Sequence, residues 1–142
     1  SKGSGLANLR VGYGVTKGPL QQYLKKVDTL FTFPSFVSSL AAVSLRDAEF
    51  VIDCRRRIAA AKRQVIAACH KLTVAKTDPE VPIMTLGHPD PAVHLSEEFI
   101  KRGILTEAGE DFIALGKNFV RLRVPAAVEP LLVRLAEIQK NL

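Results

Sequence analysis

The sequence contains no apolar run approaching the roughly 18 residues of a membrane-spanning helix, and its first residues carry no secretory signal pattern. It has only two cysteines, Cys54 and Cys69. Both fall in a segment expected to be one continuous helix, where a rise of ~1.5 Å per residue separates them by ~22 Å. A disulfide needs Cα atoms within ~7 Å of each other, so the thiols are unpaired, which is typical of a reducing compartment. These absences predict a cytoplasmic protein with no membrane partner.

Aromatic residues make up only 6% of the chain, and none interrupts its densest basic cluster. That cluster consists of Arg55, Arg56, Arg57, Lys62 and Arg63. Base stacking requires aromatic side chains, and three consecutive arginines on a helix spread around most of a turn. Although the net charge is +6, we therefore predict no nucleic-acid partner. The cluster is expected to be a solvated helix face, or a face that meets an acidic surface elsewhere.

The chain has few metal ligands and no obvious nucleophile–base pair. The loop that holds His88, Asp90 and His94 contains nitrogen and oxygen donors, but their spacing matches no zinc framework. Cys69 and His70 are neighbours whose side chains point about 100° apart on a helix, so they would not meet. We predict no metal site.

The elements expected in the first half of the chain are one strand and several helices. Leu9–Val15 alternates apolar residues with others and predicts a strand, with Arg10 on its second face. Pro19 suits the first position of a helix that runs to about residue 28. From Phe36 to about residue 72 the sequence predicts a long helix or two abutting helices, with Asp47 marking a bend or a second start.

The second half of the chain alternates short strands with helices. The expected strands cover residues 72–75, 82–86, 104–106 and 119–124, and the expected helices cover residues 94–102 and 128–140. Gly103 is well placed to end the first of these helices. Strands with two helices on one face form a two-layer sandwich, so the fold class is α/β.

The stretch Ser1–Tyr13, "SKGSGLANLRVGY", carries the strongest chemical signal in the chain. A lysine amine can bond covalently to a carbonyl carbon, and glycines allow the backbone to approach a ligand closely. A guanidinium group offers a planar fork for phosphate oxygens. Lys2 and Arg10 together are therefore suited to hold a phosphorylated aldehyde.

A second candidate site lies in "NFVRLRVP", where Arg121 and Arg123 are two residues apart on an expected strand and face the same side. Two guanidinium groups on one sheet face are costly to bury without anions, and a substrate carboxylate would supply one. Either arginine could bind it. The alternative is an exposed edge strand whose arginines are solvated.

The pattern S-K-x-x-G-L-A-x-L-R-x-G-Y resembles the cofactor-lysine segment of the fold-type I aminotransferases of class I/II, especially the histidinol-phosphate aminotransferase branch. The resemblance implies that Lys2 is the catalytic lysine that binds pyridoxal 5'-phosphate and that Arg10 binds the cofactor phosphate. It also implies that Arg121 binds the substrate α-carboxylate. The chain departs from the family pattern at Arg123, which replaces a small polar residue, and at Pro125, which replaces a glycine.

The resemblance covers the C-terminal part of such an enzyme. It implies that residues 1–34 are the end of the large cofactor-binding domain, that residues 35–71 form a long interdomain helix or helix pair, and that residues 72–142 form the small two-layer domain. The Gly-rich phosphate loop, the aromatic that stacks on the cofactor and the aspartate that pairs with its pyridine nitrogen belong to the preceding domain. This chain alone is therefore expected to be inactive.

The function implied is transfer of an amino group between an amino acid or amino-alcohol phosphate and a 2-oxo acid, in a homodimeric enzyme. Histidinol phosphate is the first candidate amino donor, and aromatic amino acids come next. Two alternatives stay open: a pyridoxal phosphate-dependent decarboxylase of the same branch, and a stand-alone α/β interaction or regulatory module without catalysis.

Overall fold

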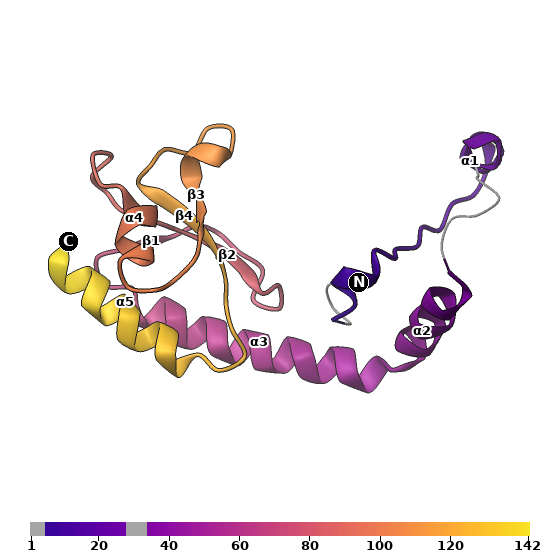
Figure 1. The fold of residues 1–142 in the computed structure, drawn as a ribbon, viewed down its shortest axis with the longest axis horizontal. Coiled ribbons are helices and arrows are strands. Elements are labelled where there is room, and N and C mark those ends of the chain that lie inside the picture. The colour runs from indigo at the N-terminus through magenta and orange to yellow at the C-terminus, as the bar shows by residue number, and fades with distance from the viewer. Residues whose placement is uncertain (1–4, 28–33) are drawn as a thin grey trace. The chain divides into compact units, whose positions relative to one another are not determined.

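The computed structural model describes residues 5–27 and 34–142. The chain divides into two compact units, of which the first ends at Cys54 and the second spans Arg55–Leu142. Figure 1 shows the elements of both units along the chain. No helix in the described part of the chain combines the length and apolar content that a membrane span requires.

The first unit contains a short 3-10 helix, η1 (Ala7–Leu9), and helix α1 (Pro19–Val27). Pro19 begins α1 as expected, because its fixed φ suits the first helical position. The strand predicted over Leu9–Val15 is wrong: residues 11–17 form no strand. An extended segment needs a neighbouring strand to accept its hydrogen bonds, and the pairings of the described residues all lie in the second unit.

Two abutting helices follow, α2 (Ser35–Arg46) and α3 (Ala48–Ala68). The break falls at Asp47, whose carboxylate Oδ1 accepts a hydrogen bond from the backbone N–H of Phe50 at 3.0 Å. An acidic side chain that satisfies a free N–H in the first turn is a common helix start. The helix-pair alternative of the sequence prediction is therefore confirmed, and α3 ends at Ala68, four residues before the predicted limit.

The second unit is built on a four-stranded antiparallel sheet with the order β1-β2-β4-β3. Its strands are β1 (Thr73–Val74), β2 (Ile83–Gly87), β3 (Glu107–Ala108) and β4 (Phe119–Arg123). The central pair places Met84 opposite Leu122 and Leu86 opposite Val120. These four side chains are buried, so they form the inner face of the sheet.

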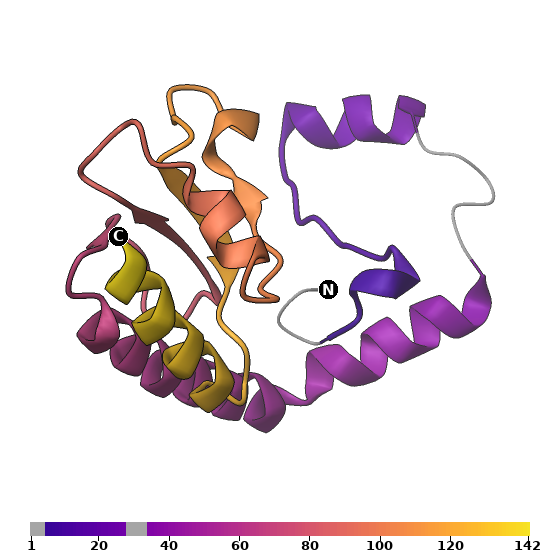
Figure 2. The ribbon, with the colours of Figure 1, turned by 60° about the vertical axis from the view of Figure 1, so that its left-hand side comes forward.

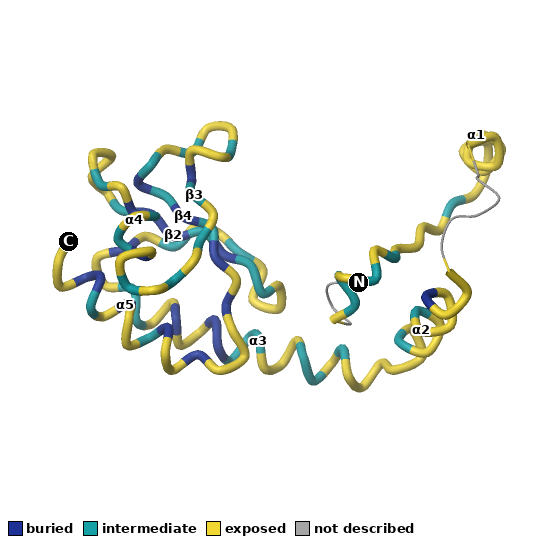
Figure 3. The backbone as a smooth tube through the Cα atoms, viewed as in Figure 1, coloured by how far each residue is buried: buried dark blue, intermediate teal, exposed yellow. Residues whose placement is uncertain are grey.

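Helices α3, α4 (Leu95–Ile100) and α5 (Glu129–Asn141) supply the other side of the core. Their most deeply buried contributions are Val65, Leu95, Phe99, Leu135 and Ile138. Figures 1 and 2 show α5 running beside the C-terminal half of α3 below the sheet, and Figure 3 shows the buried positions gathered where helices and sheet meet. The predicted α/β class and two-layer arrangement are confirmed.

The strand predicted over residues 104–106 is wrong, and β3 begins at Glu107. Gly103 ends the preceding helical segment with a φ of 74°, which only glycine adopts readily. The backbone N–H of Ile104 then donates to the carbonyl of Phe99 at 3.0 Å. Because this N–H closes the helix, it is not free to pair in the sheet.

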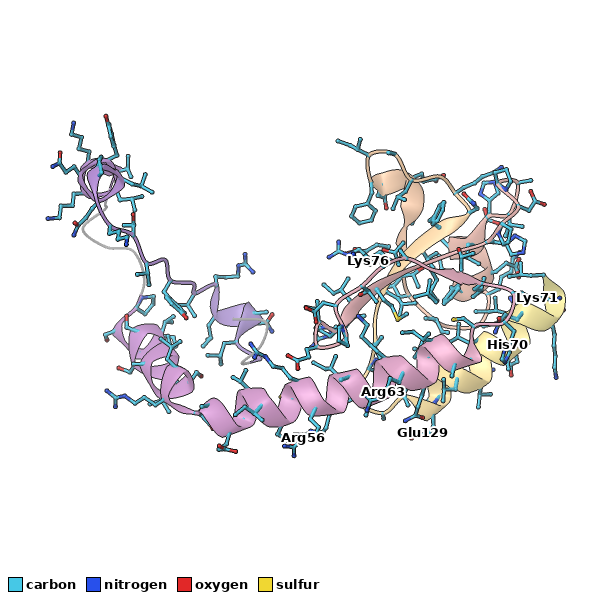
Figure 4. All side chains as sticks on the ribbon, turned by 180° about the vertical axis from the view of Figure 1, so that it is seen from behind. Arg56, Arg63, His70, Lys71, Lys76 and Glu129 are labelled. Carbon is cyan, nitrogen blue, oxygen red and sulfur yellow. The ribbon has the colours of Figure 1, made fainter. Side chains whose placement is uncertain are left out.

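Most of the basic cluster on α3 is exposed, as predicted, and Figure 4 shows Arg56 and Arg63 along one side of that helix. Lys62 is the exception, since it is 1% exposed. Its placement on a solvated face was wrong, because the helix turns this position towards the loop between β1 and β2.

Candidate functional site

Arg10 lies at the C-terminal end of η1 and is exposed. Its φ of 52° places the backbone in the left-handed region, and its Nη1 donates to the carbonyl oxygen of Ala7 at 3.2 Å. Among the described residues this is the one hydrogen bond of the Arg10 guanidinium, so its other N–H groups have no partner there and can meet an anion. Lys2, the predicted cofactor lysine, lies outside the described residues.

Arg121 lies in the middle of β4, on the face of the sheet opposite the helices. The register of β3 and β4 places Glu107 directly across from it, and Arg121 Nη1 is 2.8 Å from Glu107 Oε2. The guanidinium carbon lies 5.2 Å from the centre of the Phe112 ring, within the range of a cation–π contact. Arg121 is thus held by a carboxylate and an aromatic ring while 34% of its side chain stays exposed.

Arg123 shares this face of β4, as the two-residue spacing predicted, but it is exposed and forms no ion pair with Glu107 in the described part of the chain. It lines an open cavity of about 430 Å³ at the end of the strand, together with Leu105, Pro125 and Arg134. The two arginines therefore occupy different surroundings, and of the two only Arg121 is oriented by specific partners in the described chain.

The partners of Arg121 were missed by the sequence analysis. Glu107 was placed just after a predicted strand that does not form, so its pairing with β4 could not be derived. Phe112 follows the 3-10 turn η2 (Gly109–Asp111), which brings its ring back towards β4. The one available signal was the aromatic residue in a polar loop, which is uncommon without a packing partner.

The loop with His88, Asp90 and His94 forms turns instead of a ligand cluster. The backbone N–H of Asp90 donates to His88 Nδ1 at 3.2 Å, and Asp90 Oδ1 accepts from the backbone N–H of Ala92 at 2.8 Å. His94 Nδ1 lies 3.7 Å from Glu97 Oε1. Among the described residues no group of three or more histidine, cysteine, aspartate or glutamate side chains could hold a metal ion.

Cys69 packs against the core, and burial raises the pKa of its thiol to about 11. His70 next to it is exposed. A thiol that stays protonated at neutral pH is a poor nucleophile, so this pair has no part in a reactive site.

Arg10 belongs to the first unit and Arg121 to the second. Arg10 is exposed and Arg121 is partly exposed, so both can meet an anion. The first unit has almost no buried core, because Val37 is its one buried residue among those described. Apolar side chains such as Tyr23, Leu24 and Phe36 are largely exposed there.

Comparison with known proteins relates the whole chain to one family. The histidinol-phosphate aminotransferase of Methanocaldococcus jannaschii is 31% identical over 130 residues, which cover 87% of this chain and 34% of that protein. The histidinol-phosphate aminotransferase of Lysinibacillus sphaericus is 27% identical over 144 aligned positions, covering 99% of this chain and 38% of that protein. The chain thus spans little more than a third of the length of these relatives.

The fold has a counterpart among solved structures. The crystal structure of the histidinol-phosphate aminotransferase from Clostridium acetobutylicum matches 96% of this chain and 43% of its own length, with a TM-score of 0.77 and 17% sequence identity. At 17% sequence identity, this match shows the fold alone. The model of the aminotransferase class I and II family matches residues 1–137, so the chain belongs to this family.

Proposed function

We propose that this chain is the C-terminal part of a pyridoxal 5'-phosphate-dependent aminotransferase. The protein would transfer an amino group between an amino acid or amino-alcohol phosphate and a 2-oxo acid. The observation that carries the proposal is the family match over residues 1–137, which includes all three residues assigned from the sequence: Lys2, Arg10 and Arg121.

The donor set is suited to this cofactor. Arg10 is exposed and makes one hydrogen bond within the described part of the chain, so it can present several N–H groups to a phosphate. Gly5 has a φ of 69°, a backbone conformation that glycine adopts readily and residues with a Cβ rarely do, so the turn before Arg10 depends on it. When bound, the cofactor supplies an electron sink for the bond broken at the substrate carbon.

Lys2 and Arg121 would have separate tasks. Lys2 would hold the cofactor covalently between turnovers and then accept and return the proton of the reacting carbon as a general base and acid. Arg121 would hold the substrate carboxylate, since its side chain is partly exposed and is oriented by Glu107 and Phe112. A fixed carboxylate aligns the reacting carbon with the proton carrier, which is how positioning lowers a reaction barrier.

The proposed domain limits follow from the resemblance: residues 1–34 belong to the large domain, residues 35–71 link the domains, and residues 72–142 form the small domain. The scarcity of buried residues in the first unit supports this, because a surface with Tyr23, Leu24 and Phe36 exposed is suited to pack against further protein. A cytoplasmic homodimer acting on small molecules is part of the same proposal. Histidinol phosphate is the first candidate donor, since the two relatives above are named for it.

Borohydride reduction of the full-length protein, loaded with pyridoxal phosphate, tests the proposal. We expect a covalent adduct on Lys2, found by peptide mass analysis, and near-ultraviolet or visible absorption before reduction. The Arg10→Ala variant should bind the cofactor ~1.5–3 kcal/mol more weakly, the scale of a hydrogen bond to a charged group. A colourless protein would favour a regulatory module, and an adduct on another lysine would overturn the role of Lys2.

Carbon dioxide release distinguishes the decarboxylase of the same branch. The decarboxylase releases carbon dioxide from its amino substrate, whereas an aminotransferase converts the 2-oxo acid into an amino acid without loss of carbon dioxide. Carbon dioxide and the new amino acid can both be measured in one assay.

A further inference from the structure

The guanidinium of Arg121 already has an internal carboxylate partner. Glu107 Oε2 lies 2.8 Å from Arg121 Nη1, and the two residues face each other directly across β3 and β4. The bond is within the range of a strong charge-assisted hydrogen bond. Any substrate carboxylate that binds Arg121 must therefore share the guanidinium with Glu107 or displace it.

The contact with Phe112 helps to hold the Arg121 guanidinium in place. The guanidinium carbon lies over the ring of Phe112, 5.2 Å from the ring centre. Carboxylates bind a guanidinium in its plane, through one or two of its N–H groups. Glu107 already occupies Nη1. A substrate carboxylate whose two-point contact includes Nη1 therefore competes with Glu107 for that nitrogen.

The pair is also exposed enough to open. The exposed fractions are 34% for the Arg121 side chain and 59% for that of Glu107. A released Glu107 carboxylate can be solvated by water, so displacement does not bury an unpaired charge. The competition therefore shifts substrate affinity without abolishing binding.

We propose that Glu107 is a specificity-determining residue that competes with the substrate carboxylate for Arg121. It weakens the binding of carboxylate-bearing amino and 2-oxo acids and leaves amines that carry no anionic group unaffected. This inference rests on the proposed function, because it takes Arg121 as the carboxylate site.

Steady-state kinetics of the full-length enzyme with the Glu107→Gln variant test the proposal. Glutamine keeps the shape of the side chain but removes its charge. We expect KM for carboxylate substrates to fall by roughly two- to fivefold, the range that an exposed ion pair contributes, with kcat unchanged. KM for an amine that carries neither a carboxylate nor a phosphate should not move.

Glu137→Gln is the matched control. It removes the carboxylate of another exposed ion pair, in which Arg134 Nη1 lies 2.9 Å from Glu137 Oε2 on α5. It should leave both KM values unchanged. An equal fall in both variants would assign the effect to net charge and overturn the proposal.

A readout without catalysis is hydrogen exchange of the Arg121 Nη1–H groups, which face Glu107, measured by NMR in this chain. Exchange should become faster in Glu107→Gln, because the guanidinium loses its partner. Unchanged exchange would show that the pair does not persist in solution and would overturn the proposal.

The failure of this inference can be told apart from failure of the proposed function. If Arg121→Ala causes no selective loss with carboxylate substrates, Arg121 is not the carboxylate site and the proposed role falls. If Arg121→Ala does cause that loss but Glu107→Gln leaves KM unchanged or raises it, only the competition by Glu107 is overturned.

Discussion

Lys62, on the buried side of α3, donates a hydrogen bond from Nζ to the carbonyl oxygen of Asp78, 2.6 Å away. The same ammonium reaches the Thr77 hydroxyl at 2.6 Å and the carbonyl of Val81 at 2.9 Å. One side chain thus ties the loop between β1 and β2 to the helix. Burial lowers the pKa of Lys62, while the nearby Asp78 carboxylate acts in the opposite direction.

We expect Lys62→Met to lower the free energy of unfolding by about 2 kcal/mol or more. Methionine keeps much of the side-chain volume but donates no hydrogen bond, so the loop carbonyls lose their partner. Urea unfolding monitored by circular dichroism measures the change. Lys71→Met, in the exposed turn that follows α3, is the control and should stay within ~0.5 kcal/mol of the wild type. Equal stability of the two variants would contradict this account of Lys62.

Cys69 should resist alkylation in the folded chain. Its thiol has a pKa of about 11 because it is partly buried, so little thiolate is present near pH 8. Iodoacetamide labelling at pH 8, followed by peptide mass analysis, should be about two orders of magnitude slower at Cys69 than in the same chain unfolded in urea. Similar rates in both states would show that the thiol is accessible and ionised.

The carboxylate of Glu98 makes part of the stability depend on pH. It lies 2.7 Å from Lys101 Nζ and 2.7 Å from Arg102 Nη1, and hydrogen bonds from Lys101 and Arg102 lower its pKa below the ordinary 4.5. A pKa lowered by folding means that the unfolded chain binds the proton more tightly. The stabilisation by Glu98 is therefore complete above pH 4.5 and is lost as the pH falls through the lower, folded value.

The Glu98→Gln variant measures how much the charged carboxylate of Glu98 contributes to the free energy of unfolding. At pH 7 it should be less stable than the wild type by up to ~1 kcal/mol, the range of solvent-accessible pairs. The difference should shrink as the pH falls below 4.5. Thermal unfolding at pH 7 and pH 3 measures it, and a difference that grew with acid would reverse the sign argued here.

The sequence predicted the elements whose signals are local. Pro19 and Asp47 each begin a helix through their own backbone or side-chain chemistry. The predictions that were wrong depend on hydrogen-bond partners far away in the sequence. The apolar alternation of Leu9–Val15 has no neighbouring strand among the described residues, and the acceptors of Lys62 lie 15 to 21 positions further along the chain.

In the candidate site, too, the residue with a local signal was predicted and its partner from another strand was not. The strand spacing indicates Arg121 and Arg123 equally, and the family resemblance selects Arg121. Glu107 is brought opposite it only by the antiparallel register of β3 and β4. That register joins Glu107 to a position 14 residues away, and the sequence predicted the strand at residues 104–106 instead of at Glu107–Ala108.

We expect this chain by itself to show no aminotransferase turnover with pyridoxal phosphate. It spans little more than a third of the length of its relatives, and catalysis needs reacting groups held within ~0.5 Å of the productive geometry by surrounding protein. Adding the remaining part of the protein as a separate chain should restore activity. Turnover by this chain alone that is lost in Lys2→Ala would contradict the expectation.

We expect substitution of Arg121 and substitution of Arg123 to have different effects on the activity of the full-length enzyme. Arg121→Ala should lower kcat/KM for amino acids by roughly 10- to 100-fold, the effect of losing hydrogen bonds between charged groups, while carboxylate-free amines are used as before. Arg123→Ala is the matched control: it removes the same charge from the same face of β4, but from a side chain with no contact to Glu107 or Phe112. It should change kcat/KM less than threefold. If the selective loss instead follows Arg123→Ala, the carboxylate site lies two residues further along β4, beside the cavity that Arg123 lines.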